Sequence, residues 1–130
     1  MAIIDEDALF ARPVRRTFES EGFDVEWFAA PGEGLAAALN RTFDLLLVGV
    51  EDQGGVETCR RVRLQAMRPQ VAIIAATTDP VLHIDALLAG ADESVLKTLN
   101  MRELLARANA VLRRAAQEMR ETAAYEDDEL

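Results

Sequence analysis

Short runs of apolar residues alternate along this chain with longer stretches in which apolar residues recur at helical spacing. Residues 45–48 and 71–77, for example, offer almost nothing polar on either face of a strand. Strands of this kind are typical of parallel sheets covered by helices on both sides, where a helix joins each strand to the next. The alternation therefore predicts an α/β fold, a three-layer sandwich built from five strand–helix units.

Capping and helix-breaking residues set the expected boundaries of these units. Strands are predicted at residues 2–4, 23–28, 45–48, 71–77 and 94–97. Asp7 and Asn100 suit the caps of the first and last helices, and Pro13 predicts a kink or a later start in the first. The third helix is expected to follow a loop at residues 49–55 and to bury the stripe Val56, Cys59, Val62 and Leu64.

Composition narrows the class of protein. The 130 residues have the size of one domain, and with only 5% aromatic residues the core is expected to consist of Leu, Val, Ile and Ala. A formal charge of -9 opposes binding to nucleic acid or to an anionic membrane. Cys59 is the single cysteine, which excludes an internal disulfide and a thiolate zinc cluster. No leader or membrane-length apolar run is recognisable, so a cytoplasmic location is expected.

Polar residues follow the predicted strands at their carboxyl ends, where open parallel sheets place their sites. Asp5 and Glu6 follow the first strand. Thr77 ends the fourth strand and Lys97 the fifth. Each of these residues alone is better explained by a turn or a surface role. Together they form a set that can bind a divalent cation and a phosphoryl group.

These segments resemble the ordered motifs of the receiver domains of bacterial response regulators, and in particular those of the OmpR/PhoB type. The resemblance covers about residues 2–114 and is carried by residues 3–7, residues 44–49, Thr77 and residues 90–97. It implies a doubly wound, flavodoxin-like parallel sheet of five strands in the order 2-1-3-4-5.

The same resemblance assigns roles to single positions. Asp5 and Glu6 occupy the acid pair that holds magnesium in the family. Thr77 stands at the switch hydroxyl, and Lys97 at the lysine that contacts the phosphoryl oxygens. The resemblance therefore implies a phosphoryl pocket at the carboxyl ends of the strands.

Gly49 stands where the family has its phosphate-accepting aspartate, five residues after Asp44, which opens the third strand. An acyl phosphate requires a carboxylate nucleophile, so ordinary phosphotransfer is expected to fail. The chain departs from the family in three further ways. Ser94 replaces the aromatic switch residue, Thr98 replaces the proline after the lysine, and the loop after Gly49 is shorter.

Three alternatives stay open for the pocket. Without the central carboxylate, Lys97 is expected to pair directly with Asp5 and Glu6, so that no cofactor is required. A second possibility is that Glu51 extends into the vacancy and completes a weak Mg²⁺ site with Asp5 and Glu6. In a slipped register, Glu51 or Asp52 would instead accept a phosphoryl group with Mg²⁺.

The favoured function is that of an atypical receiver, which is not an enzyme and acts in signal transduction and transcription regulation by protein contact. Receivers of the OmpR/PhoB type dimerise through their fourth helix, fifth strand and fifth helix. Asp92, Glu93 and Arg107 are therefore predicted to lie on a homodimer face. A sensor kinase or another regulatory protein is a further expected partner.

Residues 1–118 are predicted to form the receiver domain and residues 119–130 an acidic, disordered tail. The tail resembles the linker before a winged-helix domain, so DNA would be contacted only through an effector domain outside this sequence. A small nucleotide- or flavin-binding enzyme with the same sheet order is the competing class. The acidic first turn argues against it, because the acids at residues 5–7 would repel a phosphate.

Overall fold

The computed structural model describes residues 1–65 and 71–128, with side chains as far as Ala123. Its sheet contains five parallel strands in the order β2-β1-β3-β4-β5, which confirms the predicted topology. The strands are β1 (Ala2–Ile4), β2 (Glu26–Phe28), β3 (Leu45–Gly49), β4 (Ala72–Thr77) and β5 (Glu93–Leu96).

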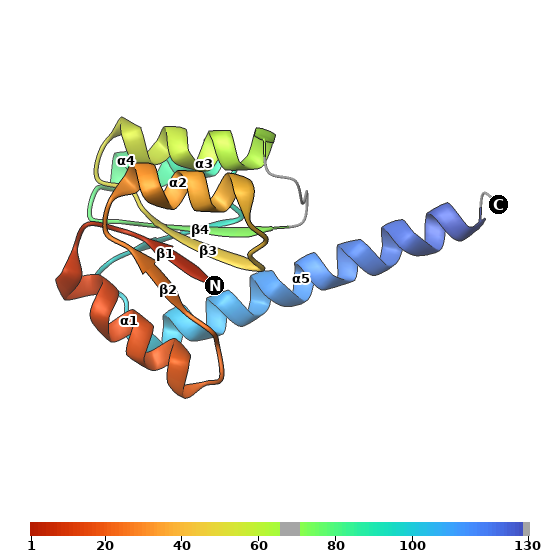
Figure 1. Ribbon diagram of the computed structural model, residues 1–130, viewed down its shortest axis with the longest axis horizontal. Coiled ribbons are helices and arrows are strands. Elements are labelled where there is room, and N and C mark those ends of the chain that lie inside the picture. The colour runs from red at the N-terminus through yellow and green to blue at the C-terminus, as the bar shows by residue number, and fades with distance from the viewer. Residues whose placement is uncertain (66–70, 129–130) are drawn as a thin grey trace.

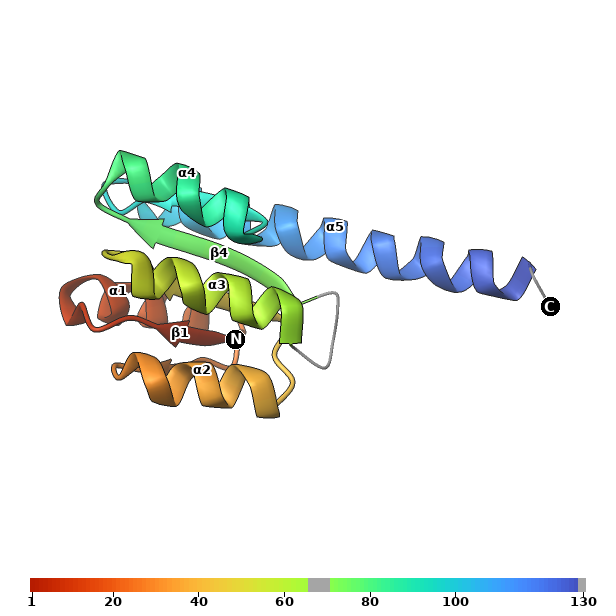
Figure 2. The same ribbon diagram turned by 90° about the horizontal axis from the view of Figure 1, so that it is seen from above.

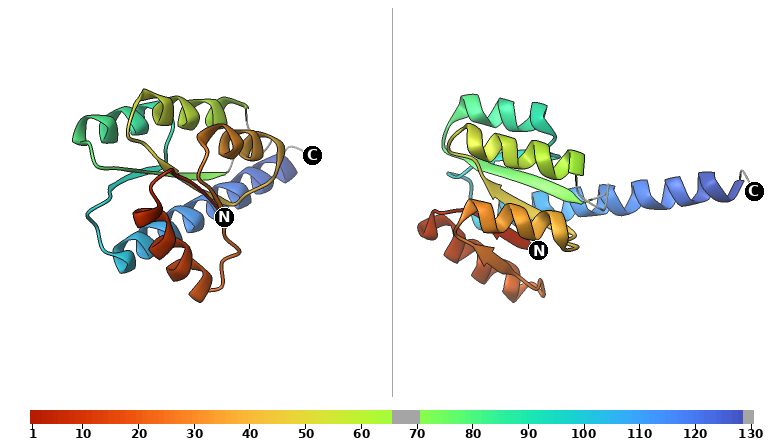
Figure 3. Two further views of the ribbon diagram at one scale, coloured as in Figure 1. Left: turned by 60° about the vertical axis from the view of Figure 1, so that its left-hand side comes forward. Right: turned by 45° about the horizontal axis from the view of Figure 1, so that its top comes forward.

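Helices cover both faces of this sheet, as the predicted three-layer sandwich requires. They are α1 (Ala8–Ser20), α2 (Pro31–Asn40), α3 (Gln53–Gln65), α4 (Pro80–Ala89) and α5 (Met101–Asp128). Figures 1 and 2 show α2, α3 and α4 on one face and α1 and α5 on the other. The two further views in Figure 3 show the same layers and the C-terminal part of α5 projecting away from the sheet.

The central strands divide their side chains between two apolar cores. Leu46 and Val48 of β3 pack with the helices α2 to α4, whereas Leu45 and Leu47 pack with α1 and α5. This alternation follows from the two-residue period of a strand. Because both faces are buried, the register of β3 is fixed, and with it the position of Gly49 at the carboxyl end of the strand.

Helix starts follow the predicted caps. The Asp7 carboxylate accepts the backbone N–H of Leu9 at 3.1 Å, and Asn100 Oδ1 accepts that of Glu103 at 2.8 Å. These bonds satisfy N–H groups that have no partner within the helix. Pro13 lies inside α1, which begins at Ala8, so the later start predicted from this proline is not found.

Two expected elements differ in detail. Residues 23–25 of the expected strand lie outside β2, whose pairing with β1 begins at Glu26 opposite Ala2. The Phe23 ring packs edge-on against the Phe18 ring, with centroids 5.0 Å apart. Helix α3 begins at Gln53, inside the expected loop. Leu64, predicted to be part of the buried stripe, is 76% exposed because it lies on the solvent side of α3.

The last helix is longer than expected. Helix α5 continues past Arg120 to Asp128, where a disordered tail was predicted. Alanine, glutamate, arginine and methionine favour helix in this segment, and Gln117 donates to Glu121 at 3.3 Å one turn later. Residues 129–130 of the predicted tail lie outside the described residues. A division between domain and tail at residue 118 stays a prediction.

Candidate functional site

The carboxyl ends of four parallel strands bring the predicted site residues to one edge of the sheet. Asp5 follows β1, Gly49 ends β3, and Thr77 ends β4. Lys97 follows β5, and its backbone N–H donates to the Thr77 carbonyl at 2.9 Å. Strand register therefore assembles residues that are far apart in the sequence.

Asp5 fills the space that a side chain at Gly49 would need. A Cβ placed on Gly49 would lie 2.5 Å from Asp5 Oδ2 and 2.7 Å from Oδ1, closer than real Cβ contacts allow. Asp5 is only 6% exposed. Its Oδ1 accepts the backbone N–H of Asp7 at 2.9 Å, which aims the carboxylate toward β3. Asp5 therefore takes the place of a Cβ at Gly49, next to a cavity that both residues line.

Lys97 places its ammonium group among three carboxylates. Lys97 Nζ lies 3.0 Å from Asp5 Oδ2, 3.1 Å from Glu51 Oε1 and 3.6 Å from Asp7 Oδ2. Its side chain is 6% exposed and packs 5.1 Å from the centroid of the Phe10 ring. Burial opposes the charge, but the carboxylates of Asp5 and Glu51 outweigh it, so the pKa of Lys97 lies above its ordinary value. Lys97 is therefore a buried cation with anionic partners.

The contacts of Lys97 agree in part with the prediction that Lys97 pairs directly with Asp5 and Glu6. Direct pairing of Lys97 with Asp5 is present. Glu6 was expected in the same pair, but it is exposed, and Lys97 contacts Asp7 and Glu51 instead. The turn after β1 accounts for this, because the Asp7 backbone N–H donates to Asp5 Oδ1 and brings Asp7 to the Asp5 carboxylate.

Glu51 turns back toward the site from the loop after β3. Besides its contact with Lys97, its carboxylate accepts the Thr78 backbone N–H at 3.1 Å and the Thr78 hydroxyl at 2.5 Å. The sequence did not predict Thr78 as a site residue, because only Thr77 ends the predicted strand. The signal available was the pair of adjacent threonines, one of which must point away from the sheet.

Thr77 and Ser94 lie in the expected places with different surroundings. Thr77 is fully buried, and its hydroxyl accepts the Asp79 backbone N–H at 3.0 Å, which is a turn contact. Ser94 is 4% exposed, and its hydroxyl has no hydrogen-bond partner in the described part of the chain. Ser94 and Thr98 line a hollow of about 540 Å³ between α4, β5 and α5. A larger side chain at residue 94 would have room to enter this hollow.

The acids of the site do not fit a magnesium ion well. Within the described residues, no group of three or more His, Cys, Asp or Glu side chains is arranged to hold a metal ion. Asp5 and Glu51 are both engaged by Lys97, which lies where a cation would have to bind. A cavity of about 240 Å³ beside Gly49 is lined by all four acids of this region, Asp5, Glu6, Glu51 and Asp52.

Residues predicted for a dimer face make contacts within the chain. The Asp92 carboxylate accepts the Ile73 backbone N–H at 2.8 Å and pairs with Arg63 at 2.6 Å. Arg107 lies 3.5 Å from Glu93 and 3.0 Å from Glu103. These anions raise the pKa of Arg107. Asp92 therefore joins α3 to β4, whereas the half-buried Glu93 pairs with the exposed Arg107.

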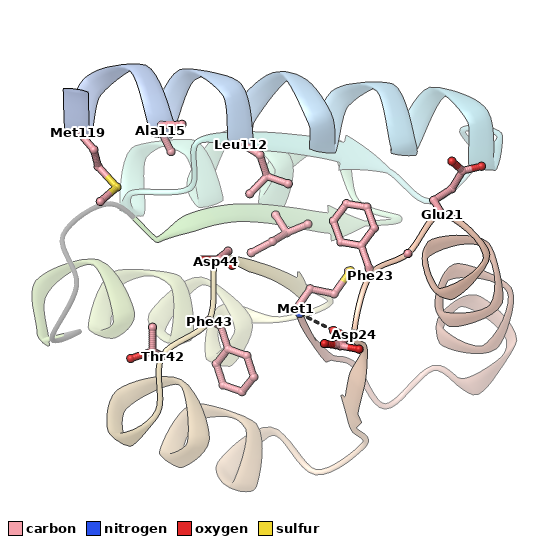
Figure 4. A pocket seen from close by; sticks show the side chains of 13 residues that line it. Met1, Glu21, Phe23, Asp24, Thr42, Phe43, Asp44, Leu112, Ala115 and Met119 are labelled. Carbon is pink, nitrogen blue, oxygen red and sulfur yellow. Dashed lines mark hydrogen bonds between the residues drawn. The ribbon is translucent and has the colours of Figure 1, made fainter. Parts of the chain in front are cut away.

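A second hollow lies at the opposite end of the sheet. Its volume is about 580 Å³, and Figure 4 shows Leu112 and Met119 of α5 above it, with Phe23, Phe43 and Asp44 opposite. The amino group of Met1 donates to the Asp24 carbonyl at 2.6 Å, and burial lowers its pKa. None of the residues predicted for the phosphoryl pocket lies here. Across residues 1–65 and 71–128, no helix is long and apolar enough to span a bilayer.

Comparisons with known proteins agree with this fold. The family model described as "Response regulator receiver domain" matches residues 1–109. The response regulator ArlR of Staphylococcus saprophyticus is 34% identical over 117 residues, covering 88% of this chain and 53% of that protein. ResD, a transcriptional regulatory protein of Bacillus subtilis, is 28% identical over 117 residues, covering 88% of this chain and 48% of its own length. The chain thus spans about half the length of these two relatives.

A solved structure shows the same fold. The crystal structure of a CheY-like receiver domain protein from Methanospirillum hungatei has a TM-score of 0.81 and 30% identity. The match covers 90% of this chain and 95% of that one. Nearly all of the two chains therefore superpose, with the five strands in one order.

Proposed function

We propose that this chain, which belongs to the response regulator receiver domain family, signals without forming an aspartyl phosphate. As a receiver domain it is a module of two-component signalling. One observation supports the proposal: the Asp5 carboxylate takes up the space beside Gly49, the residue that the resemblance aligns with the phosphoacceptor. The chain would then act by protein contact and not as an enzyme.

Lys97 supports this proposal by replacing a metal ion. A divalent cation in such a pocket would need carboxylate oxygens as its ligands. The ammonium group of Lys97 lies within 3.1 Å of both Asp5 and Glu51 and supplies them with one positive charge without an ion. The pocket would therefore require no cofactor.

Phosphorylation of Glu51 or Asp52 is the competing function. For Glu51 to act as a nucleophile, its carboxylate would have to leave Lys97 and both donors of Thr78. Asp52 accepts the Gly55 backbone N–H at 3.2 Å, at the first turn of α3. Each carboxylate is thus held by contacts that favour its present position over attack on phosphorus.

The contact surface that we propose lies on α4, β5 and α5. Helix α4 presents the apolar side chains of Val81, Ile84 and Leu88 to solvent, with exposures of 66%, 58% and 82%. Their spacing places them on one side of the helix. Beside them lie Glu93 and Arg107, which carry opposite charges. A patch with both charges is complementary to itself across a twofold axis, so we propose a homodimer through this face.

A sensor kinase or another regulatory protein is a second proposed partner. Any role in transcription would depend on an effector domain, because a formal charge of -9 opposes DNA binding by this chain itself. The relatives ArlR and ResD are about twice as long as the matched region, which leaves room for such a domain in proteins of this type.

Light scattering tests the proposal in solution. We expect a dimer whose mass is the same before and after treatment with acetyl phosphate and Mg²⁺, and Leu88→Glu should convert it to a monomer. Glu118→Ala, on the exposed side of α5, serves as the matched surface control. A dimer that appears only after acetyl phosphate treatment would contradict the proposal.

A further inference from the structure

The Glu51 carboxylate is held by several polar groups of the same chain, as a bound anion would be. It forms an ion pair with Lys97 Nζ at 3.1 Å and accepts two hydrogen bonds, from the Thr78 backbone N–H at 3.1 Å and from the Thr78 hydroxyl at 2.5 Å. Hydrogen bonds in which one partner is ionised are about twice as strong as neutral ones. Glu51 belongs to the loop after β3, whereas Thr78 belongs to the loop before α4. The carboxylate therefore joins two loops that the chain does not connect directly.

Continuous contacts lead from Gly49 to this bridge. Asp5 occupies the space beside Gly49 and pairs with Lys97, and Lys97 pairs with Glu51. Glu51 in turn holds Thr78. The links from Asp5 to Lys97, from Lys97 to Glu51 and from Glu51 to the Thr78 hydroxyl are 3.0, 3.1 and 2.5 Å long, and the Lys97 side chain is buried. Motion at any one of these groups is thus coupled to its neighbours.

The bridge ends at the start of α4. Thr78 precedes Asp79, whose carboxylate caps α4 by accepting the Val81 backbone N–H at 2.8 Å. A second contact runs in parallel, because Gln53 of α3 donates to Asp85 of α4 at 3.2 Å. The segment after β3 therefore holds α4 at two points along its length.

We infer that Glu51 is a built-in carboxylate latch, which fixes the position of α4 permanently by occupying donors that would otherwise be free for an incoming oxyanion. This inference rests on the proposed function, since a domain that signals without phosphate needs another group to hold α4. The latch keeps the apolar side of α4, with Val81, Ile84 and Leu88, in one orientation. It therefore keeps the dimer face permanently formed.

Hydrogen exchange of the intact 130-residue chain tests the latch. Glu51→Ala should speed exchange of the Thr78 amide and of the amides in the first turn of α4 roughly threefold to tenfold, because the opening of this segment loses one charged acceptor. Thr78→Val removes only the hydroxyl donor and should give a smaller change in the same amides. Glu33→Ala, an exposed acid on α2, should leave them at the wild-type rate.

Dimerisation gives an independent measurement. Glu51→Ala should weaken the dimer in light scattering, and Glu51→Gln, which keeps the length and one acceptor oxygen, should recover part of both effects. Unchanged exchange in α4 for both Glu51→Ala and Thr78→Val would overturn the latch but leave signalling without phosphate intact. A phosphoryl group added to the wild-type chain would overturn the proposed function itself, and with it the latch.

Discussion

The carboxylate of Asp5 lies where the side chain of residue 49 would begin, and only a glycine at residue 49 leaves it room. In this position Asp5 pairs with Lys97 at 3.0 Å. The acid that follows β1, Asp5, thus packs against the residue without a side chain on β3, Gly49. The two residues form one packed unit, and a change at either should be felt by the other.

Gly49→Ala should destabilise the domain. The new Cβ would meet Asp5 at 2.5 Å and force it away from Lys97, so we expect a loss of about 1–3 kcal/mol in the free energy of unfolding. Urea unfolding measures this loss. Gly32→Ala on α2 is the matched control, because its added Cβ meets nothing within 4 Å. Equal stability of the two variants would show that Asp5 does not fill the space beside Gly49.

Lys97→Met should lower the free energy of unfolding more than Gly49→Ala does. The substitution leaves the buried Asp5 carboxylate and its neighbours Asp7 and Glu51 without their cation, and breaking a buried ion pair on one side costs about 3–5 kcal/mol. Lys97→Arg keeps the charge and should lose less. Denaturant unfolding of the three proteins tests the order. A Lys97→Met protein as stable as wild type would mean that the ammonium group is not required for neutralisation.

The free energy of unfolding should fall at alkaline pH because Lys97 loses its proton. The folded state raises the pKa of Lys97 above its ordinary value of 10.5, so the stabilisation is complete below that pH and is lost as the pH rises through the folded-state pKa. Lys97 is the only lysine of the chain, so Lys97→Met isolates its effect from the arginines and Tyr125. Unfolding free energies measured from about pH 9 upward should decline more steeply for wild type than for the variant. Parallel curves would contradict the raised pKa.

Asp92→Ala should affect stability and not assembly. Its carboxylate accepts the Ile73 backbone N–H and pairs with Arg63, which joins α3 to the start of β5. Loss of these partly exposed contacts should cost about 1 kcal/mol in urea unfolding. The dimer mass in light scattering should stay unchanged, in contrast to Leu88→Glu. If the Asp92→Ala protein were a monomer, Asp92 would contribute to the dimer face after all.

Much of the fold could be predicted because local signals agree with it. The apolar runs of β3 and β4, the caps Asp7 and Asn100, and the motifs shared with the receiver family all pointed to one strand order. The boundaries of β2 and α5 could not be predicted. In the first case, pairing with β1 begins at Glu26, and the Phe23 ring packs against the Phe18 ring. In the second, helix propensity continues into an acidic segment.

Site residues that lie at the ends of strands could be predicted from the sequence. Those whose contacts depend on the direction of a side chain could not. Asp5, Gly49 and Lys97 follow from register. The sequence predicted Glu6 as a partner of Lys97 and Asp7 as a helix cap, whereas the structure places the Asp7 carboxylate near Lys97 as well. Thr78 could not be distinguished from Thr77 for the same reason.

The central claim is that the pocket around Gly49 accepts no phosphoryl group. Incubation of the wild-type chain with acetyl phosphate and Mg²⁺, followed at once by intact-mass measurement, tests it most directly, with an aspartate-containing receiver domain treated in parallel as the positive control. We predict that the control gains the mass of one phosphoryl group and that this chain stays at its unmodified mass. A phosphoryl adduct on this chain that is lost in the Glu51→Gln or Asp52→Asn variant would contradict the account.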